Sequence, residues 1–417
     1  MINKTTLDNG VRLVTERLEH AYSVTAGLWM EVGSRDEEPA QGGISHFIEH
    51  MAFKGTAKRD ALAIARELDR MGGMANAFTS KEITCFHART LAELLPEIAD
   101  LLTDIFLFPS YPAPELERER QVILQEISSV EDAPDELVHV LFGRDYWPES
   151  PMGRPVLGDA ESVGAVSRQD LVDYLAGSYV PAKLVVAAVG DLEHERLVEL
   201  MAPALSGLPV STGRNHRQPP SPQPGLRVHR RDSEQVHVAM GAPGPSAKDP
   251  DRFAGALLNV ILGGNMSSRL FQEVREKRGL AYAVFSYLSS YSDAGLFGVY
   301  LGVAPGRSPE ALKVVKDELA RLAVEPVSHE ELVHAKEHTK GSILLAAENS
   351  DSRMSRLARN EFNFGRDVPL EEVVANIEAV QVEDLTRVAA RCLDPKVLGI
   401  TVLGPADAEG LASEVAS

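Results

Sequence analysis

The chain has 417 residues, of which 44% are hydrophobic and 25% are charged. This length exceeds what one ordinary hydrophobic core serves, so two or more domains are expected. The formal net charge of −19 argues against binding to nucleic acids or anionic membranes, because both require basic patches.

Cysteine content and hydropathy together favour a location in the cytoplasm. Cys85 and Cys392 are the only cysteines, so no disulfide framework is expected and a reducing environment is favoured. The first residues lack the apolar run of a signal peptide. No apolar stretch approaches the ~20 residues of a membrane-spanning helix. We therefore expect a soluble, cytoplasmic protein with no membrane partner.

The N-terminal third alternates strand-like and helix-like patterns, with Asn, Gly and Pro at the junctions. Polar–Gly pairs mark turns, and apolar residues at three- and four-residue spacing mark helices. In chain order the pattern predicts a hairpin turn at 7–11, a strand at 23–32, a short helix ending near Gly55, a helix at 60–71, two strands within 74–88, and helices at 91–106 and 114–130.

An internal repeat divides the chain. The segment 203–225 is rich in Pro, Gly, Ser and Arg and indicates an extended linker. Residues 166–171 match 380–385 at an offset of 214, which also places Pro181 on Pro395 and Gly190 on Gly404. Each copy predicts a helix, a proline turn and a buried strand. We expect an α+β fold of two homologous α/β-sandwich domains, each a mainly antiparallel sheet packed with helices, at 1–208 and 226–417 with a linker at 209–225.

A possible metal site begins with the segment His46-Phe47-Ile48-Glu49-His50. Histidines four residues apart on a helix present both imidazoles on one face, which suits two ligands of a tetrahedral zinc ion. The order His-x-x-Glu-His is a known hydrolase signature, with Glu49 placed to activate water. Five residues alone are weak evidence.

A third ligand is available on the predicted helix 114–130. Glu119 and Glu126 fall on its apolar stripe, beside Leu116, Ile123 and Ile127. A carboxylate on a core-facing stripe is costly unless it is paired or bound to metal. A tilted helix with both glutamates in solvent remains the alternative.

These segments resemble the pitrilysin/insulinase family of zinc peptidases, which includes mitochondrial processing peptidase. Glu126 follows His50 by 76 positions, as the glutamate ligand does in that family. The resemblance covers essentially the whole chain and is closest to the short two-domain bacterial members and the catalytic beta subunit of the processing peptidase. Its further motifs are Gly42-Gly43-Ile44-Ser45-His46, Phe53-Lys54-Gly55-Thr56, Asn76-Ala77-Phe78-Thr79 and Gly153-Arg154-Pro155-Val156-Leu157-Gly158.

The resemblance implies roles in the first copy. It makes His46, His50 and Glu126 ligands of one Zn²⁺ per chain, Glu49 the general base, and Glu119 a carboxylate supporting the site. It also implies that the strand containing 76–78 (Asn76, Ala77 and Phe78) takes up an extended peptide by β-addition. An ordinary internal strand is the alternative for that segment.

The second copy lacks the same ligands, since the offset of 214 places Val260, Gly263 and Gly264 opposite the motif and Lys340 opposite Glu126. The resemblance instead assigns Arg275 and Tyr282 to holding the substrate backbone. A surface helix residue and a strand core residue are their structural alternatives. Gly263 and Gly264 fit either a flexible loop or a tight turn.

The resemblance also implies partners. Larger family members enclose a chamber with four such domains, so this two-domain chain is expected to form a homodimer, or a heterodimer with an inactive paralogue, acting on unfolded peptides. A non-catalytic structural subunit, and an assembly partner that keeps zinc for stability, are the rival functions. The other histidines show no ligand spacing that indicates a second site, and Trp29 and Trp147 are expected in the core.

Overall fold

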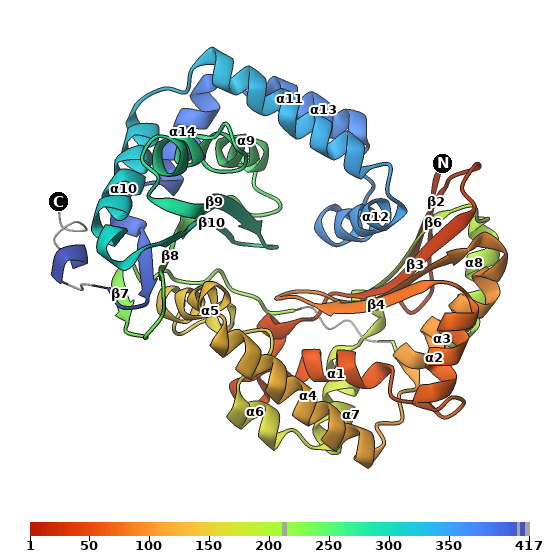
Figure 1. Cartoon of the computed structure of the whole chain (residues 1–417). Helices are drawn as coiled ribbons and strands as arrows, with labels where there is room; N and C mark the ends of the chain where they lie inside the picture. Colours follow the sequence, from red (N-terminus) through yellow and green to blue (C-terminus); the bar gives the residue numbers. More distant parts are fainter. Residues whose placement is uncertain (211–214, 407–408, 413–417) are drawn as a thin grey trace. The chain divides into compact units, whose positions relative to one another are not determined.

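The computed structural model describes residues 1–210, 215–406 and 409–412 (Figure 1). It divides into two compact units that differ from the two sequence halves. The first unit comprises 1–128, 155–217 and 345–367, and the second comprises 129–154, 218–344 and the described residues from 368 onward. Each half of the sequence thus contributes one segment to the unit that is mainly built from the other half.

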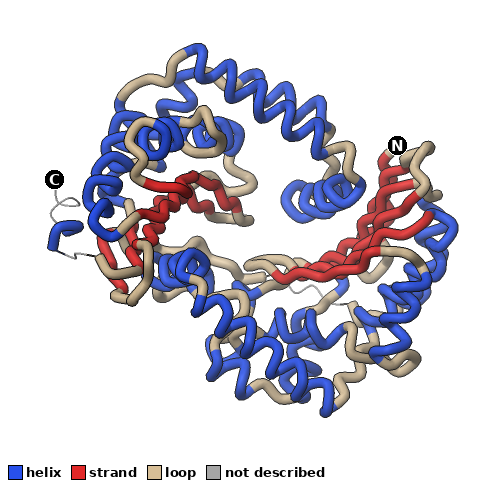
Figure 2. Tube along the Cα trace, in the orientation of Figure 1, coloured by secondary structure: helices blue, strands red, loops and turns tan. Residues whose placement is uncertain are grey.

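The first unit contains a six-stranded sheet (Figure 2). Neighbouring strands are antiparallel except for one parallel pair, β2 with β6, so the sheet is mainly antiparallel as expected. In spatial order the strands are β1 (Ile2–Thr6), β2 (Arg12–Arg17), β6 (Leu184–Gly190), β3 (Ser23–Met30), β5 (Thr84–Leu91) and β4 (Met74–Thr79).

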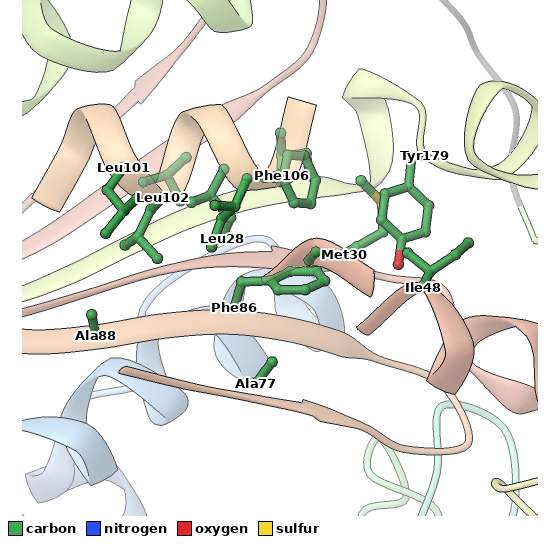
Figure 3. Packing of buried hydrophobic residues seen from close by; sticks show 14 of the residues in the cluster. Leu28, Met30, Ile48, Ala77, Phe86, Ala88, Leu101, Leu102, Phe106 and Tyr179 are labelled. Atoms are coloured by element: carbon green, nitrogen blue, oxygen red, sulfur yellow. The ribbon is translucent and has the colours of Figure 1, made fainter. Parts of the chain in front are cut away.

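Helices cover one face of this sheet and bury its main core. Figure 3 shows Leu28 and Phe86 of the sheet meeting Leu101 and Phe106 of α3, with Ile48 of α1 beside them. These side chains are nearly inaccessible to solvent, and their burial is the main contribution to the stability of this face. The helices of the first unit's main body are α1 (Ile44–Ala52), α2 (Ala61–Arg70), α3 (Leu95–Leu107), α4 (Ala113–Asp132), α6 (Ala160–Ala165), α7 (Arg168–Ser178) and α8 (His194–Leu205).

The opposite face of the first sheet is covered by α12 (Ser350–Phe364), a helix from the C-terminal half of the sequence. Met354 and Leu357 pack with Trp29 and Val185 in a separate buried cluster. Trp29 is therefore a core residue, as predicted.

The second unit repeats this plan with five strands. Its sheet also contains a single parallel pair, β7 with β11. The strands in spatial order are β7 (Gly225–His229), β11 (Gly399–Leu403), β8 (Val236–Pro243), β10 (Gly295–Val303) and β9 (Ala281–Ser290), and the helices are α5 (Pro134–Tyr146), α9 (Arg252–Leu262), α10 (Ser308–Val324), α11 (His329–Ala346), α13 (Leu370–Ala379) and α14 (Val382–Cys392).

Here the exchanged helix is α5, which packs on β11 and β8. Phe142, Tyr146 and Trp147 join Tyr300 in the buried cluster on that face. In the duplicated sequence α5 corresponds to α12, so the exchange is reciprocal.

The predicted repeat is confirmed in three dimensions. Helices α7 and α14 are each followed by a short 3-10 turn that begins at Pro181 or Pro395, and then by β6 or β11. Both strands lead to a glycine with positive φ, 144° at Gly190 and 138° at Gly404. The α+β two-domain fold class is therefore correct.

Local differences from the expected elements are small. The predicted helix 91–106 begins as α3 only at Leu95, because β5 extends to Leu91 and a 3-10 turn follows it. Part of the predicted linker, 211–214, lies outside the described residues. Arg217 of that linker is held in the first unit by Asp36, to which it donates at 2.7 Å. No helix within the described ranges is both long and apolar enough to cross a membrane.

Candidate metal centre

The start of α1 sets the position of the His/Glu segment. Gly43 caps the helix in the left-handed region, with φ of 88°. Glu37 is buried, and its carboxylate accepts hydrogen bonds from the backbone N–H groups of Gly43 (2.8 Å) and Ser45 (2.9 Å). These contacts satisfy donors that a helix N-terminus leaves unpaired, and the negative charge suits that end of the helix.

Two glycine segments pack directly behind this turn. A Cβ atom at Gly43 would lie 2.5 Å from the Leu157 carbonyl oxygen, and one at Gly158 would lie 2.4 Å from the Gly42 carbonyl oxygen. No larger residue fits at either position. The Gly42-Gly43 and Gly153–Gly158 motifs therefore lie against each other and fix where α1 begins.

Helix α1 then presents its two histidines to α4, where Glu126 completes a group of three. The two Nε2 atoms of His46 and His50 are 3.2 Å apart, and each lies 3.7 Å from Glu126 Oε2. Within the described part of the chain this is the one cluster of three His, Cys, Asp or Glu side chains whose ligand atoms approach closely enough for a metal ion.

The three atoms fit a zinc ion. Ligands at ~2.0–2.1 Å from tetrahedral zinc lie about 3.3 Å from one another, close to the three separations found. Burial, followed by the charge of His50, lowers the pKa of His46 to about 4, so its imidazole is neutral at pH 7, as metal binding requires. The donor set of two imidazoles and one carboxylate also matches catalytic zinc sites, which leave a fourth position open.

Glu119 lies behind His50. One oxygen of its buried carboxylate is 3.0 Å from His50 Nδ1, and the other accepts from the Lys54 ammonium at 2.7 Å. A carboxylate in this place orients the imidazole and leaves the Nε2 lone pair for a metal. Lys54 supplies the opposite charge that a buried carboxylate needs.

Glu49 lies on α1 next to His50, and its side chain contacts strand β4. Its Oε2 accepts a hydrogen bond of 2.6 Å from the Thr79 hydroxyl of β4. Burial raises the pKa of the Glu49 carboxyl, and the Thr79 hydrogen bond opposes that rise. The arrangement gives one carboxylate in a protected position next to a prospective metal.

The segment 76–78 lies on β4, which is the edge strand of the first sheet. The Asn76 side chain accepts from the Ala77 backbone N–H at 2.9 Å, and Ala77 itself is buried against the core. Phe78 packs edge-to-face on Trp29 with ring centroids 5.5 Å apart. The segment is thus not internal, and its backbone, rather than the Phe78 ring, is what it can offer to a peptide.

Arg275 and Tyr282 lie together in the second unit. Arg275 belongs to a π-helical segment, Phe271–Glu276, and its guanidinium carbon lies 4.7 Å from each of the ring centroids of Phe271 and Tyr282. Tyr282 is 79% exposed, so the strand-core alternative for it is wrong. Gly263 lies at the end of α9, in close contact with β9. A Cβ atom added to Gly263 would lie 2.4 Å from the Ser286 backbone nitrogen, so the close packing favours the tight turn over the flexible loop.

Three contributors to the centre were not assigned roles from the sequence. Lys54 and Thr79 were noted only as members of motifs, and Glu37 was not noted at all. Lys54 and Thr79 act through contacts between segments far apart in the sequence, whereas Glu37 caps a helix whose N-cap residue, Gly43, lies only six residues later. The motifs themselves were the available signal for Lys54 and Thr79.

The sequence matches two family models. Residues 12–160 match a model described as insulinase (peptidase family M16), and residues 165–338 match one described as peptidase M16 inactive domain.

Curated relatives of similar length carry the description uncharacterized zinc protease. One from Streptomyces coelicolor is 40% identical over 97% of this chain and 90% of that protein. One from Mycobacterium tuberculosis is 39% identical over 96% and 93%. One from Bacillus subtilis is 36% identical over 93% and 95%.

Solved structures share the fold at lower identity. A structure described as the peptidase M16 inactive domain from Pseudomonas fluorescens has a TM-score of 0.92 at 23% identity, covering 98% of this chain and 99% of that one. A protease from Helicobacter pylori gives 0.89 at 23%, covering 97% and 99%. A chain of complex III2 from Candida albicans gives 0.84 at 22%, covering all of both chains.

Proposed function

The chain belongs to the insulinase family of M16 peptidases, and from that premise we propose that it is a zinc-dependent endopeptidase that hydrolyses unfolded peptides in the cytoplasm. The observation that carries the proposal is the half-buried Glu49 carboxylate, held by Thr79 beside the group formed by His46, His50 and Glu126. A structural subunit has no need of a protected base next to a metal-ligand group.

Each residue of the centre has a separate role in the proposed hydrolysis of a peptide bond. His46, His50 and Glu126 would hold zinc, while Glu119 and Lys54 keep the His50 imidazole in place. Zinc, when bound, supplies a Lewis acid that lowers the pKa of water and polarises the scissile carbonyl. Glu49 accepts the proton of the attacking water and passes it to the leaving amine.

The substrate is proposed to be an extended peptide that adds to the free edge of β4. Main-chain hydrogen bonds to such an edge bind peptides with little dependence on sequence. An unfolded peptide can present an extended segment with unpaired backbone groups on both sides, whereas the backbone groups of a folded protein are mostly paired already. Arg275 and Tyr282 would then hold the peptide backbone from the partner subunit of a homodimer that encloses the peptide.

The test is cleavage of an internally quenched, unstructured peptide by the purified, zinc-loaded protein. We expect activity that a chelator removes and zinc restores. Glu49→Gln should lower kcat by about 10²–10⁴-fold, because the base is lost while the three ligands remain. Zinc content measured on the same sample should be unchanged.

Wild-type turnover by Glu49→Gln would remove Glu49 from the mechanism. A zinc-loaded wild-type protein that cleaves nothing, alone or at concentrations that form dimers, would favour the structural subunit instead.

A further inference from the structure

The sequence alone did not indicate His334 and His338 as ligands, but this second pair has the same four-residue spacing as the pair in the candidate metal centre. His334 and His338 are four residues apart on α11, which is continuous from His329 to Ala346. Side chains at this spacing lie on one face of a helix, with Cβ atoms about 5–6 Å apart. Both residues are exposed. Their imidazoles can therefore reach a common ligand from solvent.

Unlike the buried histidines His194 and His237, these two imidazoles have no partner among the described residues. His194 is flanked by the hydroxyls of Thr5 and Thr15, at 2.8 and 2.9 Å, and His237 lies 2.9 Å from the Tyr300 hydroxyl. Among the described residues, His334 and His338 make no hydrogen bond, ion pair or ring contact. Their ring nitrogens are therefore open to an external ligand.

The pair lines a hollow in the second unit with a volume of about 490 Å³. Its lining also includes the buried residues Ile261 and Ala335 and the residues 265–268, in which Met266 is 74% exposed. Glu331 also lines the hollow, but Arg269 holds its carboxylate through two contacts of 2.7 and 3.0 Å. Besides the amide and hydroxyl oxygens of Asn265, Ser267 and Ser268, the hollow offers a ligand two imidazoles and one thioether.

We propose that His334 and His338 form a second metal site, which takes a transition-metal ion that prefers imidazole. Copper fits best, because Met266, which lines the same hollow, offers a soft thioether donor and copper heads the divalent affinity order. Nickel and zinc would bind more weakly, with water completing their coordination. Magnesium and calcium require oxygen ligands and would not bind. The site is independent of the proposed peptidase activity.

The experiment uses the full chain loaded with one equivalent of zinc. Cu²⁺ is added, the protein is desalted, and copper and zinc are both quantified, with electron paramagnetic resonance of the bound Cu²⁺. We expect a retained copper equivalent without loss of zinc, and a spectrum with coupling to two ring nitrogens. His334→Gln or His338→Gln should each weaken copper binding on the order of 100-fold, since a chelate becomes a single contact.

His329→Gln is the matched control, because His329 is an exposed histidine at the start of the same helix and does not line the hollow. Its copper affinity should equal that of the wild type. All three substitutions are on the surface, so loss of folding is not expected. Copper gained only in proportion to zinc lost would place the ion at His46 and His50 and overturn the proposal. Unchanged affinity in the His334→Gln, His338→Gln double variant would do the same.

Discussion

Thr79 connects two parts of the centre that the sequence separates by 30 positions. Its hydroxyl donates to Glu49 Oε2 at 2.6 Å, and it comes from the edge strand β4 to which the peptide is proposed to add. A carboxylate fixed on one oxygen presents the other in a constant direction. We therefore predict that Thr79 is a positioning residue, which links the strand proposed to bind the peptide to the proposed base.

Thr79→Val removes the hydroxyl and keeps the shape of the side chain. We predict that kcat falls by roughly 10- to 100-fold, because a small displacement of a catalytic group is costly, while KM and zinc content stay near the wild-type values. Steady-state kinetics with the quenched peptide would measure this split. Thr79→Ser keeps the donor and should recover most of kcat. A fall in zinc content equal to the fall in kcat would mean that Thr79 supports the fold of the site only.

Some residues of the site could be predicted from the sequence, and others could not. His46 and His50 were predicted to lie together because helical spacing alone places them on one face, and the structure brings Glu126 to them. The cost of a carboxylate on an apolar stripe singled out Glu119 and Glu126 together, and of the two only Glu119 is buried, against His50 and Lys54. The partner Lys54 depends on a tertiary contact with Glu119, and Glu37 reaches the start of α1 across a loop that has no regular spacing, so no helical pattern indicates either residue. The roles of Arg275 and Tyr282 in binding substrate stay predictions.

At the scale of elements, α1 depends on a glycine that no other residue replaces. Gly43 has φ of 88° and lies against the Leu157 carbonyl. We predict that Gly43→Ala lowers the free energy of unfolding by at least about 1–3 kcal/mol, because the left-handed conformation is strained for alanine and the added Cβ meets backbone. Chemical denaturation would measure the loss, and zinc affinity should fall with it.

Gly177 supplies the control for this substitution. It lies inside α7, and a Cβ there would meet nothing within 4 Å. Gly177→Ala should leave stability unchanged or raise it by about 0.5–1 kcal/mol, as alanine favours a helix over glycine. Equal losses in the two variants would contradict the special role of Gly43.

The contact of α5 with the second sheet predicts a pH dependence. His139 of α5 and His237 of β8 both lie against Tyr300, and burial lowers the pKa of both imidazoles. Unfolded histidines take up protons near pH 6.5, whereas these folded ones do so only at lower pH. Their contribution to stability is therefore complete above about pH 6.5 and is lost as the pH falls below it.

Urea unfolding at a series of pH values from 7.5 to 5 tests this prediction. The free energy of unfolding of the wild type should fall steadily below about pH 6.5, and His237→Gln should fall less steeply because one titrating group is gone. Parallel curves for the two proteins would show that His237 does not contribute.

At the scale of the whole molecule, the duplication recurs in detail. The Arg120 guanidinium of α4 donates to the Val166 carbonyl after α6 at 2.7 Å, and the Lys336 ammonium of α11 donates to the Glu378 carbonyl of α13 at 2.7 Å. Helix α4 of the first copy corresponds to α11 of the second. In each copy this helix donates from a cationic side chain to a backbone carbonyl at the end of a later helix, α6 or α13. The repeat in the sequence was enough to predict two related sandwich domains.

The sequence did not predict the exchange of α5 and α12. An apolar stripe on a helix shows that the helix packs on a sheet but does not show on which sheet. Since the two sheets are related by duplication, their outer faces are both apolar, and only the three-dimensional path of the chain decides between them.

The exchange predicts that a substitution in the C-terminal half destabilises the unit that holds the metal centre. Leu357 of α12 is 1% exposed and packs in the cluster with Trp29. Leu357→Ala should lower the free energy of unfolding by about 2–5 kcal/mol through lost burial and a cavity. Amide hydrogen exchange should show the largest loss of protection in β6 and β3. Leu344→Ala, at a position 50% exposed, should leave both measurements unchanged.

The reciprocal helices also constrain how the gene could have arisen. A single copy of this repeat that kept the observed path of its chain would leave one apolar sheet face bare and one apolar helix without a sheet to cover. Two such copies would satisfy each other only by trading helices, which is domain swapping between identical protomers. A one-copy chain with this path would therefore bury its apolar surfaces by pairing, and fusion of two copies would turn that association between chains into one within a chain.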